Sequence, residues 1–451
     1  MNFTVGKLTE KNKHMEDGPM KKLAALALAM MMLLSIAATA LAQSPEIVVE
    51  IWHTRGAGAN LEVMEASVKT FNETIGKEKG IRVDHVFQGP YIETMTKTMN
   101  AIAANEPPEM VVLERAAGVP VMAAEGVLAD LGPYVEKSNL DLDNFAQILL
   151  AYSYDQDGQL ISLPYIRSTP VFYYNKTMWD AAGLTAPATI DELIAAGKQL
   201  TKMGANGETD VYGFQLLNDP AWFIQNMLVQ LGSNVFTEDG LSVPALEDGT
   251  MLKTLSAWRE WVDEGWTAPF VSTSAADAMY ALFNQGRLAS FMQSCGSMAN
   301  IIKNASEAPE PFEVGVAFLP TWDKPAAPTG GGNIAMISEG NDTEHLDAAW
   351  EFINFLMSDE QVAYSAAKTG YLPSTKTSTD AQILQDLYAE YPQYKVAFDQ
   401  LENGQEIPYS QYKDDFEKAW RSVCSLLIQD RSITAEEAVQ MLKDEASIIF
   451  P

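Results

Sequence analysis

The residues best suited to chemistry, the histidines and cysteines, are scarce in this sequence. It has four His and two Cys, and His53, His85 and His345 share no motif. The metalloprotease pattern H-E-x-x-H, the nucleophile-elbow pattern G-x-S-x-G and the phosphate-binding pattern G-x-x-x-x-G-K-[ST] are all absent. We therefore predict no catalytic residue, no metal site and no cofactor, and we expect these histidines to be structural.

Two further motifs resemble functional loops but have structural interpretations. Gly56-Ala57-Gly58 lacks the third glycine of a dinucleotide-binding loop. Asp155-Gln156-Asp157-Gly158 resembles the start of a calcium-binding loop, but the glutamate that closes such a loop is missing. A hairpin turn is the better interpretation of this second motif.

Composition excludes several classes of protein. The chain has 451 residues, of which 60 are acidic and 30 basic, so its formal charge is −30. A nucleic-acid-binding protein needs a basic surface, and an anionic membrane would repel this chain for the same reason. Hydrophobic residues make up 47% of the sequence, which is enough for well-packed cores in two or three domains.

The N-terminal segment predicts export. Met20-Lys21-Lys22 precedes an apolar run over residues 23–40, and small residues stand at Ala40 and Ala42. A basic start, an apolar core and an A-x-A ending define a cleaved signal peptide, here residues 1–42. A membrane anchor is the alternative, and the lack of a basic flank after the run disfavours it. We expect a periplasmic protein.

The remaining chain alternates predicted strands and helices. Apolar or alternating runs predict strands over residues 47–52, 81–85, 110–113, 171–174, 288–292, 314–319 and 334–337. The capping-box patterns Thr189-x-x-Glu192, Ser358-x-x-Gln361 and Thr434-x-x-Glu437 predict helix starts. Such alternation predicts an α/β protein with largely parallel sheets.

Three segments together resemble a known family. They are Leu163-Pro164-Tyr165-Ile166-Arg167-Ser168-Thr169-Pro170-Val171-Phe172-Tyr173-Tyr174-Asn175-Lys176, Phe283-Asn284-Gln285-Gly286-Arg287 and Lys368-Thr369-Gly370-Tyr371-Leu372-Pro373-Ser374. In this order and at these intervals they resemble the solute-binding proteins of bacterial ABC importers, family 1, of the carbohydrate type. The resemblance runs from about residue 47 to residue 446.

The resemblance implies a two-lobed, periplasmic-binding-protein-like (type II) fold of the α/β class. Mixed sheets would be flanked by helices, with hinge strands between the lobes. We expect residues 43–168 and 293–340 in lobe 1, and residues 169–292 and 341–451 in lobe 2. The protein would be a monomer without enzymatic activity that docks on the permease of the importer. Because a bridge across moving lobes would obstruct closure, Cys295 and Cys424 are expected to be free, partly buried thiols.

Within the family, the closest resemblance is to the members that bind sn-glycerol-3-phosphate. It rests on Trp52-His53-Thr54, Gln88-Gly89-Pro90-Tyr91, Arg167-Ser168-Thr169-Pro170 and Gly296-Ser297-Met298-Ala299-Asn300-Ile301. The ligand-binding positions that it implies are Tyr91, Glu114, Ser168, Trp222, Ser294, Gly332 and Tyr371. Trp222 lies in an apolar stretch, so a core position is the alternative there.

One position departs from the family pattern and leaves the ligand open. The family holds phosphate with an arginine on a late helix, and the alignment places Lys418 or Glu417 there. Arg115 and Arg167 stand beside ligand positions and could compensate. The expected ligand is therefore a glycerol-3-phosphate-like compound, including a glycerophosphodiester, or a sugar. A neutral di- or oligosaccharide is the alternative within the class, and an exported glycoside hydrolase is the alternative outside it.

Overall fold

A computed structural model gives the fold of the chain and describes residues 46–272, 275–405 and 407–451. The expected signal peptide lies outside these residues. Within the part of the chain that is described, no helix is both long and apolar enough to cross a bilayer.

Five strands form the first sheet. In spatial order they are β2 (Ile81–Phe87), β1 (Ile47–His53), β3 (Met110–Glu114), β11 (Gly330–Met336) and β4 (Leu163–Ser168). Strands β1 and β3 run parallel, whereas β11 is antiparallel to both β3 and β4. The first four residues of β3 are fully buried, as their continuous apolar run predicts.

A second sheet has the order β8 (Ser290–Ser294), β5 (Pro170–Asn175) and β9 (Val314–Ala317), and both of its pairings are antiparallel. Two small ladders pair β6 (Lys202–Met203) with β7 (Thr209–Val211) and β10 (Ala327–Pro328) with β12 (Gly404–Gln405). The expectation of largely parallel sheets is therefore wrong. The chain leaves the first sheet after β4 and returns to it at β11, which runs antiparallel to its neighbours. The alternation of strands and helices in the sequence does not reveal this strand direction.

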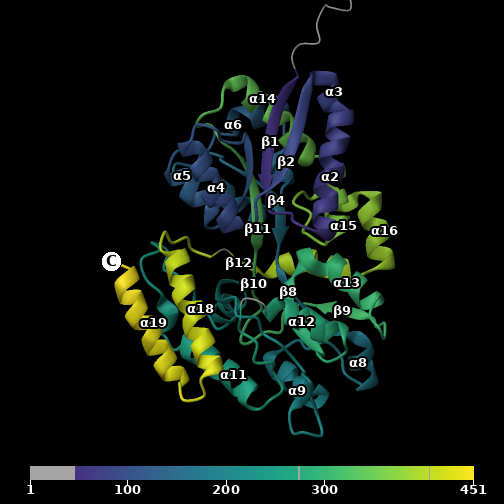
Figure 1. Cartoon of the computed structure of the whole chain (residues 1–451), viewed down its shortest axis with the longest axis vertical. Coiled ribbons are helices and arrows are strands. Elements are labelled where there is room, and N and C mark those ends of the chain that lie inside the picture. The colour runs from purple at the N-terminus through teal and green to yellow at the C-terminus, as the bar shows by residue number, and fades with distance from the viewer. Residues whose placement is uncertain (1–45, 273–274, 406) are drawn as a thin grey trace, which may run out of the picture. The chain divides into compact units, whose positions relative to one another are not determined.

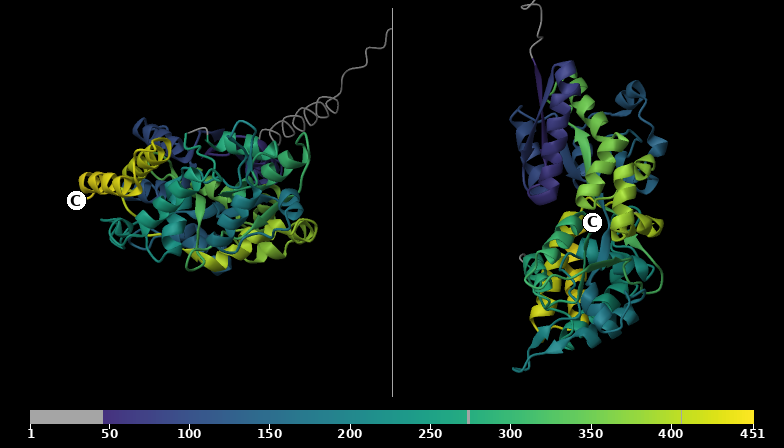
Figure 2. Two further views of the ribbon diagram at one scale, coloured as in Figure 1. Left: turned by 90° about the horizontal axis from the view of Figure 1, so that it is seen from below. Right: turned by 90° about the vertical axis from the view of Figure 1, so that its right-hand side faces the viewer.

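Helices cover both sheets (Figure 1). In chain order they are α2 (Gly58–Glu73), α3 (Ile75–Lys79), α4 (Tyr91–Ala103), α5 (Gly118–Ala124), α6 (Gly132–Ser138), α7 (Gln147–Leu150), α8 (Lys176–Ala181), α9 (Ile190–Leu200), α10 (Gln225–Gln230), α11 (Thr250–Asp263), α12 (Ala275–Asn284), α13 (Met298–Ser306), α14 (Thr343–Leu356), α15 (Asp359–Thr369), α16 (Gln382–Glu390), α17 (Gln393–Asp399), α18 (Lys413–Gln429) and α19 (Ala435–Ile449). The last two, α18 and α19, pack side by side next to the C-terminus (Figures 1 and 2).

Packing groups the segments differently from the expected lobe boundaries. Strand β9 pairs with β5, so residues 314–317 belong to the second sheet. Helix α14 contacts β2 and β11, and α15 contacts α2, so residues 343–369 lie beside the first sheet. We therefore propose that residues 314–317 belong to lobe 2 and residues 343–369 to lobe 1, the reverse of the expected assignment.

The capping boxes show where tertiary structure overrides a local pattern. Both hydrogen bonds of the box are present at Thr189 and at Thr434, so these two predictions are confirmed. At Ser358 the hydroxyl accepts the Gln361 N–H. However, the Gln361 side chain accepts a hydrogen bond of 3.1 Å from Ser67 on α2 instead of closing the box. This bond joins α15 to α2.

The predicted hairpin turn at Asp155 is confirmed. Its carboxylate accepts the backbone N–H groups of Asp157 and Gln159 at 2.9 and 2.8 Å. Tyr154 and Leu160 pair across the turn in antiparallel fashion. The carboxylate is therefore committed to the turn, in agreement with a structural role.

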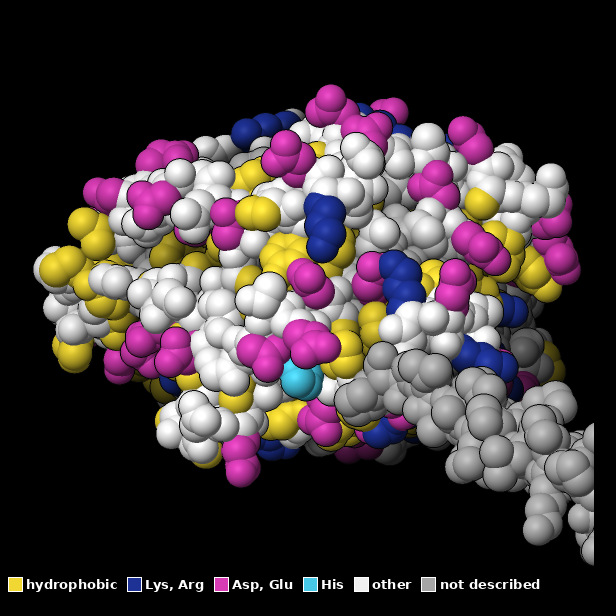
Figure 3. Space-filling model, turned by 90° about the horizontal axis from the view of Figure 1, so that it is seen from above, with side chains coloured by type: hydrophobic (Ala, Val, Ile, Leu, Met, Phe, Trp, Pro, Cys, Tyr) yellow, Lys and Arg dark blue, Asp and Glu magenta, His cyan; other side chains and the backbone are white. Residues whose placement is uncertain are grey.

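Acidic side chains are spread over the face shown in Figure 3, with Lys and Arg side chains between them. Most ion pairs of the described residues are similarly exposed, for example Lys69 with Glu73. Exposed pairs of this kind contribute about 0–1 kcal/mol each, so the acidic surface affects solubility more than fold.

Candidate ligand-binding site

The edge between β3 and β11 brings together three of the expected ligand positions. Gly332 lies opposite Glu114 in the antiparallel pairing of these strands. A Cβ atom on Gly332 would stand 2.9 Å from both Cε1 and the hydroxyl of Tyr91. Tyr91, Glu114 and Gly332 therefore meet at the end of one sheet, where the buried run of β3 gives way to a carboxylate.

Tyr91 begins helix α4 directly after Pro90. Burial raises the pKa of its phenol well above the ordinary value, and the nearby Tyr371 and Glu114 raise it further. The phenol is therefore neutral over the whole physiological range and can both donate and accept a hydrogen bond. Glu114 is half-buried, and one of its oxygens already accepts the Ala116 N–H at 2.9 Å.

A cavity of about 110 Å³ opens at this edge. Its lining residues are Tyr91, Ile92, Met95, Glu114, Ala117, Gly118, Lys413 and Asp414. The last two come from the start of α18, so the cavity lies between the first sheet with its helices and a helix far along the sequence. One hydroxyl, two carboxylates and an ammonium group lie among apolar side chains, which suits a solute that carries both hydroxyl groups and C–H faces.

The cation at this cavity is Lys413, and sequence reasoning missed it. Its ammonium lies 2.9 Å from the carboxylate of Glu417, and each of the two side chains is only 17% exposed. Lys418, the expected position, is 74% exposed and pairs with Asp415 at 3.0 Å. The structure therefore does not bring Lys418 to the cavity. The spacing of four residues between Lys413, Glu417 and Arg421 places all three on one side of α18, which was the signal available in the sequence.

Ser168 and Ser294 lie where the chain crosses between the two sheets. Ser168 ends β4 opposite Gly330, and Ser294 pairs with Pro170 at the start of β5. The Ser294 hydroxyl accepts the Gly296 N–H at 3.2 Å, so part of its capacity serves a local turn. Both serines remain proposed ligand contacts.

Two aromatic side chains pack directly on glycines near this crossing. The Trp222 ring lies against Gly330, and the Tyr371 ring lies against Gly296, so a Cβ atom on either glycine would clash with the ring. Trp222 is half-buried and packs on the core of the second sheet, in agreement with the core alternative, and its contact with ligand stays a proposal. The glycines explain how large rings fit beside the crossing strands.

The two arginines proposed as phosphate contacts are buried inside the crossing. Arg167 donates to the carbonyl of Gly330 at 2.9 Å and to the side chain of Asn333 at 3.2 Å. Burial and the nearby Arg115 lower its pKa to about 9. Arg115 donates to the carbonyl of Thr329 and lies 4.0 Å from the Tyr152 ring centroid. These partners tie both guanidinium groups to neighbouring segments of the chain, although the buried Nε and Nη1 atoms of Arg115 have no hydrogen-bond partner among the described residues.

A further buried cation, Arg55, also escaped sequence reasoning. It stands 5.0 Å from the ring centroid of Tyr165 and 5.5 Å from that of Tyr371, and it donates to the Ser365 hydroxyl at 3.1 Å. Arg55 directly follows Trp52-His53-Thr54, one of the motifs that carry the resemblance to the family. This position in the sequence could have indicated Arg55 as a candidate. A cation at this distance attracts an aromatic ring, so Arg55 helps to hold Tyr371, one of the proposed ligand contacts, in place.

The histidines have the structural surroundings that their isolation predicted. His53 is fully buried and lies 3.0 Å from His85, and its Nδ1 accepts the Arg55 N–H at 3.1 Å. Burial, His85 and Arg55 together lower its pKa to about 3, so it is neutral at physiological pH. His345 pairs with Asp342 at the start of α14.

The remaining reactive groups are the two cysteines. Cys295 and Cys424 are free, as predicted, and both are buried completely rather than partly. Within the described residues, no three His, Cys, Asp or Glu side chains are grouped so that they could hold a metal ion.

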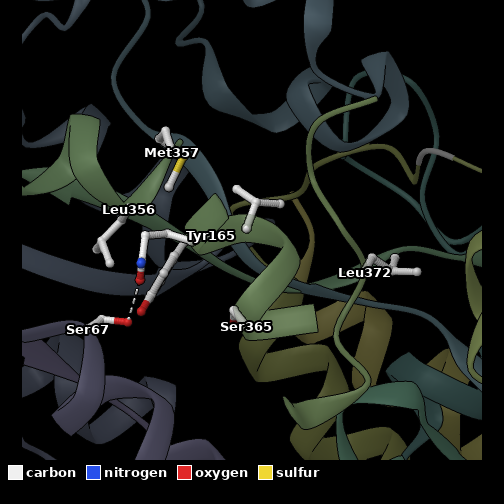
Figure 4. A pocket seen from close by; sticks show the side chains of 8 residues that line it. Ser67, Tyr165, Leu356, Met357, Ser365 and Leu372 are labelled. Carbon is white, nitrogen blue, oxygen red and sulfur yellow. Dashed lines mark hydrogen bonds between the residues drawn. The ribbon is translucent and has the colours of Figure 1, made fainter. Parts of the chain in front are cut away.

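A second, smaller pocket lies between α2, β4 and α15, where Ser67 donates to Gln361 beside Tyr165 (Figure 4). Its volume is about 10 Å³. That volume holds about one water molecule, so the pocket is too small for a solute.

Comparison with known proteins identifies the class. Residues 66–396 match the family model for bacterial extracellular solute-binding proteins. The sn-glycerol-3-phosphate-binding periplasmic protein UgpB of Rhizobium meliloti (strain 1021) is 28% identical over 353 residues, which cover 76% of this chain and 78% of that protein. UgpB of Yersinia pseudotuberculosis serotype I (strain IP32953) is 26% identical over 379 residues, 80% of this chain and 82% of that protein.

Solved structures agree with this result. UgpB from Mycobacterium tuberculosis in complex with glycerophosphocholine has a TM-score of 0.76 at 25% identity, and the match covers 90% of this chain and 98% of that one. The maltose-bound MalE3 of T. maritima also has a TM-score of 0.76, at 20% identity, covering 89% and 100%. These likenesses confirm the expected two-lobed solute-binding fold.

Proposed function

Because this chain belongs to the family of bacterial extracellular solute-binding proteins, we propose that it captures a glycerol phosphate compound or a sugar and delivers it to the permease of an ABC importer. The observation that carries the proposal is the cavity between Tyr91 and Glu114 on one side and Lys413 on the other. The relatives are named for binding glycerol-3-phosphate or were solved with glycerophosphocholine or maltose. These ligands carry the hydroxyl groups that the side chains of the cavity could bind.

The proposed contacts divide by chemistry. Tyr91, Glu114 and Lys413 exchange hydrogen bonds with ligand hydroxyls, and Gly332 lets the strand approach the ligand closely. Trp222 and Tyr371 offer ring faces to the C–H side of the ligand, and Ser168 and Ser294 contact it from the crossing strands. Residues from both sheets would thus touch one ligand, which stabilises the closed arrangement of the lobes.

A thermal-shift panel tests the proposal. It includes glycerol-3-phosphate, glycerophosphocholine, maltose and trehalose, each at millimolar concentration. A ligand at about 100 times its Kd stabilises the native state by about 2.7 kcal/mol, so at least one compound is expected to raise Tm by several degrees. If no compound raises Tm, and small-angle scattering shows no compaction with any of them, the proposal fails.

The cellular setting follows from the same proposal. We expect a monomeric periplasmic protein whose signal peptide is cleaved near Ala42, and whose closed form docks on the permease. Incubation with glycosides is expected to release no monosaccharide. Release of a monosaccharide would favour the exported glycoside hydrolase instead.

A further inference from the structure

Charged side chains from strand β3 and helix α18 set the charge at the cavity. Among the described residues that line the cavity, Lys413 is the sole cation, and Glu114 and Asp414 are the anions. The Lys413 ammonium is not directed to the cavity alone, because Glu417 holds it at 2.9 Å. Both partners of this ion pair are largely removed from water, so the pair is less screened than an ion pair on the surface.

The two groups of this pair affect each other's ionisation. Burial lowers the pKa of Lys413, but the negative charges of Glu114 and Glu417 offset this effect and leave the pKa above its ordinary value. Burial raises the pKa of Glu417, and Lys413 opposes this rise. Lys413 is therefore a protonated lysine whose charge is already shared between two carboxylates before any ligand arrives.

We propose that Glu417 is a specificity-determining residue: by pairing with Lys413, it makes the cavity accept the hydroxyl groups of a solute and reject a phosphomonoester dianion. This inference rests on the proposed function and narrows its ligand. It favours a sugar, or a phosphodiester whose glycerol hydroxyls enter the cavity, over glycerol-3-phosphate.

Electrostatic repulsion opposes a phosphomonoester in this cavity. A phosphomonoester carries about −1.5 to −2 charges at neutral pH. In this cavity it would meet Glu114 and Asp414, and the single positive charge of Lys413 is already balanced by Glu417, so no net positive charge is left to compensate the dianion. Uncompensated charge in a largely buried site is costly, which opposes binding. A hydroxyl group brings no charge, and it can donate to Glu114 and accept from one of the three N–H groups of Lys413 while the ion pair stays intact. Discrimination thus comes from repulsion of the wrong ligand.

Glu417→Gln tests this inference, because it removes the charge and keeps the shape of the side chain. Isothermal titration calorimetry at pH 7.5 compares glycerol-3-phosphate, glycerophosphocholine and maltose. The wild-type protein is expected to bind its preferred non-monoester compound at least tenfold more tightly than glycerol-3-phosphate. In Glu417→Gln, the affinity for glycerol-3-phosphate is expected to rise at least tenfold, with less than a threefold change for the other compound.

Two further variants locate the effect. Asp415→Asn removes an equal charge from the same helix, but its partner Lys418 is exposed, so the affinities are expected to stay unchanged. Adding Lys413→Met to Glu417→Gln is expected to abolish the gain for glycerol-3-phosphate. Circular dichroism and thermal unfolding of each variant check that it is folded.

The outcomes separate this inference from the proposed function. If the wild-type protein binds glycerol-3-phosphate most tightly, or if Glu417→Gln gains no more than Asp415→Asn, this inference is overturned and the proposed function stands. If neither the wild-type protein nor any variant binds a compound of the panel, the proposed function fails, and the inference fails with it.

Discussion

The hydroxyl of Tyr91 lies so close to Gly332 that a single methyl group on the glycine would stand 2.9 Å from it. Tyr91 opens helix α4 and Gly332 lies in strand β11, with 240 positions between them in the sequence. The contact therefore depends on the fold as a whole. It also fixes how closely the tyrosine approaches the carboxylate of Glu114, which is the partner of Gly332 in the sheet.

Gly332→Ala is expected to weaken ligand binding at least tenfold, because the added methyl group would stand 2.8 Å from Val112 Cγ1 and 2.9 Å from the Tyr91 hydroxyl, which displaces the Tyr91 side chain that lines the cavity. Overpacking of this kind also destabilises a protein by about 1–3 kcal/mol. Titration calorimetry with the solute identified by the thermal-shift panel measures the first effect, and urea unfolding measures the second. Gly183→Ala is the control for affinity alone: no atom lies within 4 Å of its Cβ position, so affinity should not change, although its φ of 70° makes an alanine there cost about 1–2 kcal/mol of stability. Unchanged affinity in Gly332→Ala would argue against a ligand at this edge.

The fold was predictable where the local pattern and the tertiary environment agree. The apolar run before Glu114 became a buried strand, and Thr189 and Thr434 cap helices as their capping boxes predict. Strand direction was not predictable, because it depends on the sheet to which the chain returns. Likewise, the Gln361 side chain bonds to Ser67 on another helix, a partner that no local pattern contains.

Arg167→Met is expected to destabilise the protein by about 3 kcal/mol or more, because several buried acceptors would each lose a donor at a cost of about 1–3 kcal/mol. These acceptors include the carbonyl of Gly330 and the side chain of Asn333. Urea unfolding measures the loss. Arg431→Met is the control, because Arg431 is 78% exposed and is expected to contribute less than about 1 kcal/mol. A variant of Arg167 that keeps full stability but loses affinity for glycerol-3-phosphate would restore its role as a phosphate contact.

The candidate site was predictable only in part, for a physical reason. Tyr91, Glu114 and Gly332 follow recognisable motifs on regular elements, and the structure brings them together. The cation on α18 was misplaced because several charged residues follow one another there, and helical phase decides which side chain is buried. Lys413 faces Glu417 inside, whereas Lys418 faces solvent.

The two cysteines are expected to be unreactive until the protein unfolds. Burial raises the pKa of Cys295 to about 12 and also raises the pKa of Cys424, so neither forms the nucleophilic thiolate at pH 8. A thiol-specific reagent should label essentially no cysteine in the native protein. It should label both cysteines in about 6 M guanidinium, which unfolds the protein fully. Fast native labelling would contradict the burial, and no labelling after unfolding would indicate a disulfide.

Acid is expected to destabilise the protein through His53. Its folded-state pKa of about 3 lies below the value of about 6.5 in the unfolded chain, so the unfolded state takes up a proton first. The stability linked to His53 is thus fully present above pH 6.5 and is lost as the pH falls from 6.5 towards 3. Between pH 6.5 and 4.5 the loss is about 2–3 kcal/mol.

Urea unfolding at pH 7 and pH 4.5 measures this loss in the wild-type protein and in His53→Asn, whose side-chain oxygen can still accept the Arg55 N–H. The variant is expected to lose less stability on acidification than the wild-type protein does. His345→Asn is a control of opposite sign: hydrogen bonding to Asp342 raises the pKa of His345, so its small contribution is present below pH 6.5 and is lost as the pH rises through that raised pKa. If wild type and His53→Asn respond equally to acid, the stability does not depend on keeping His53 neutral.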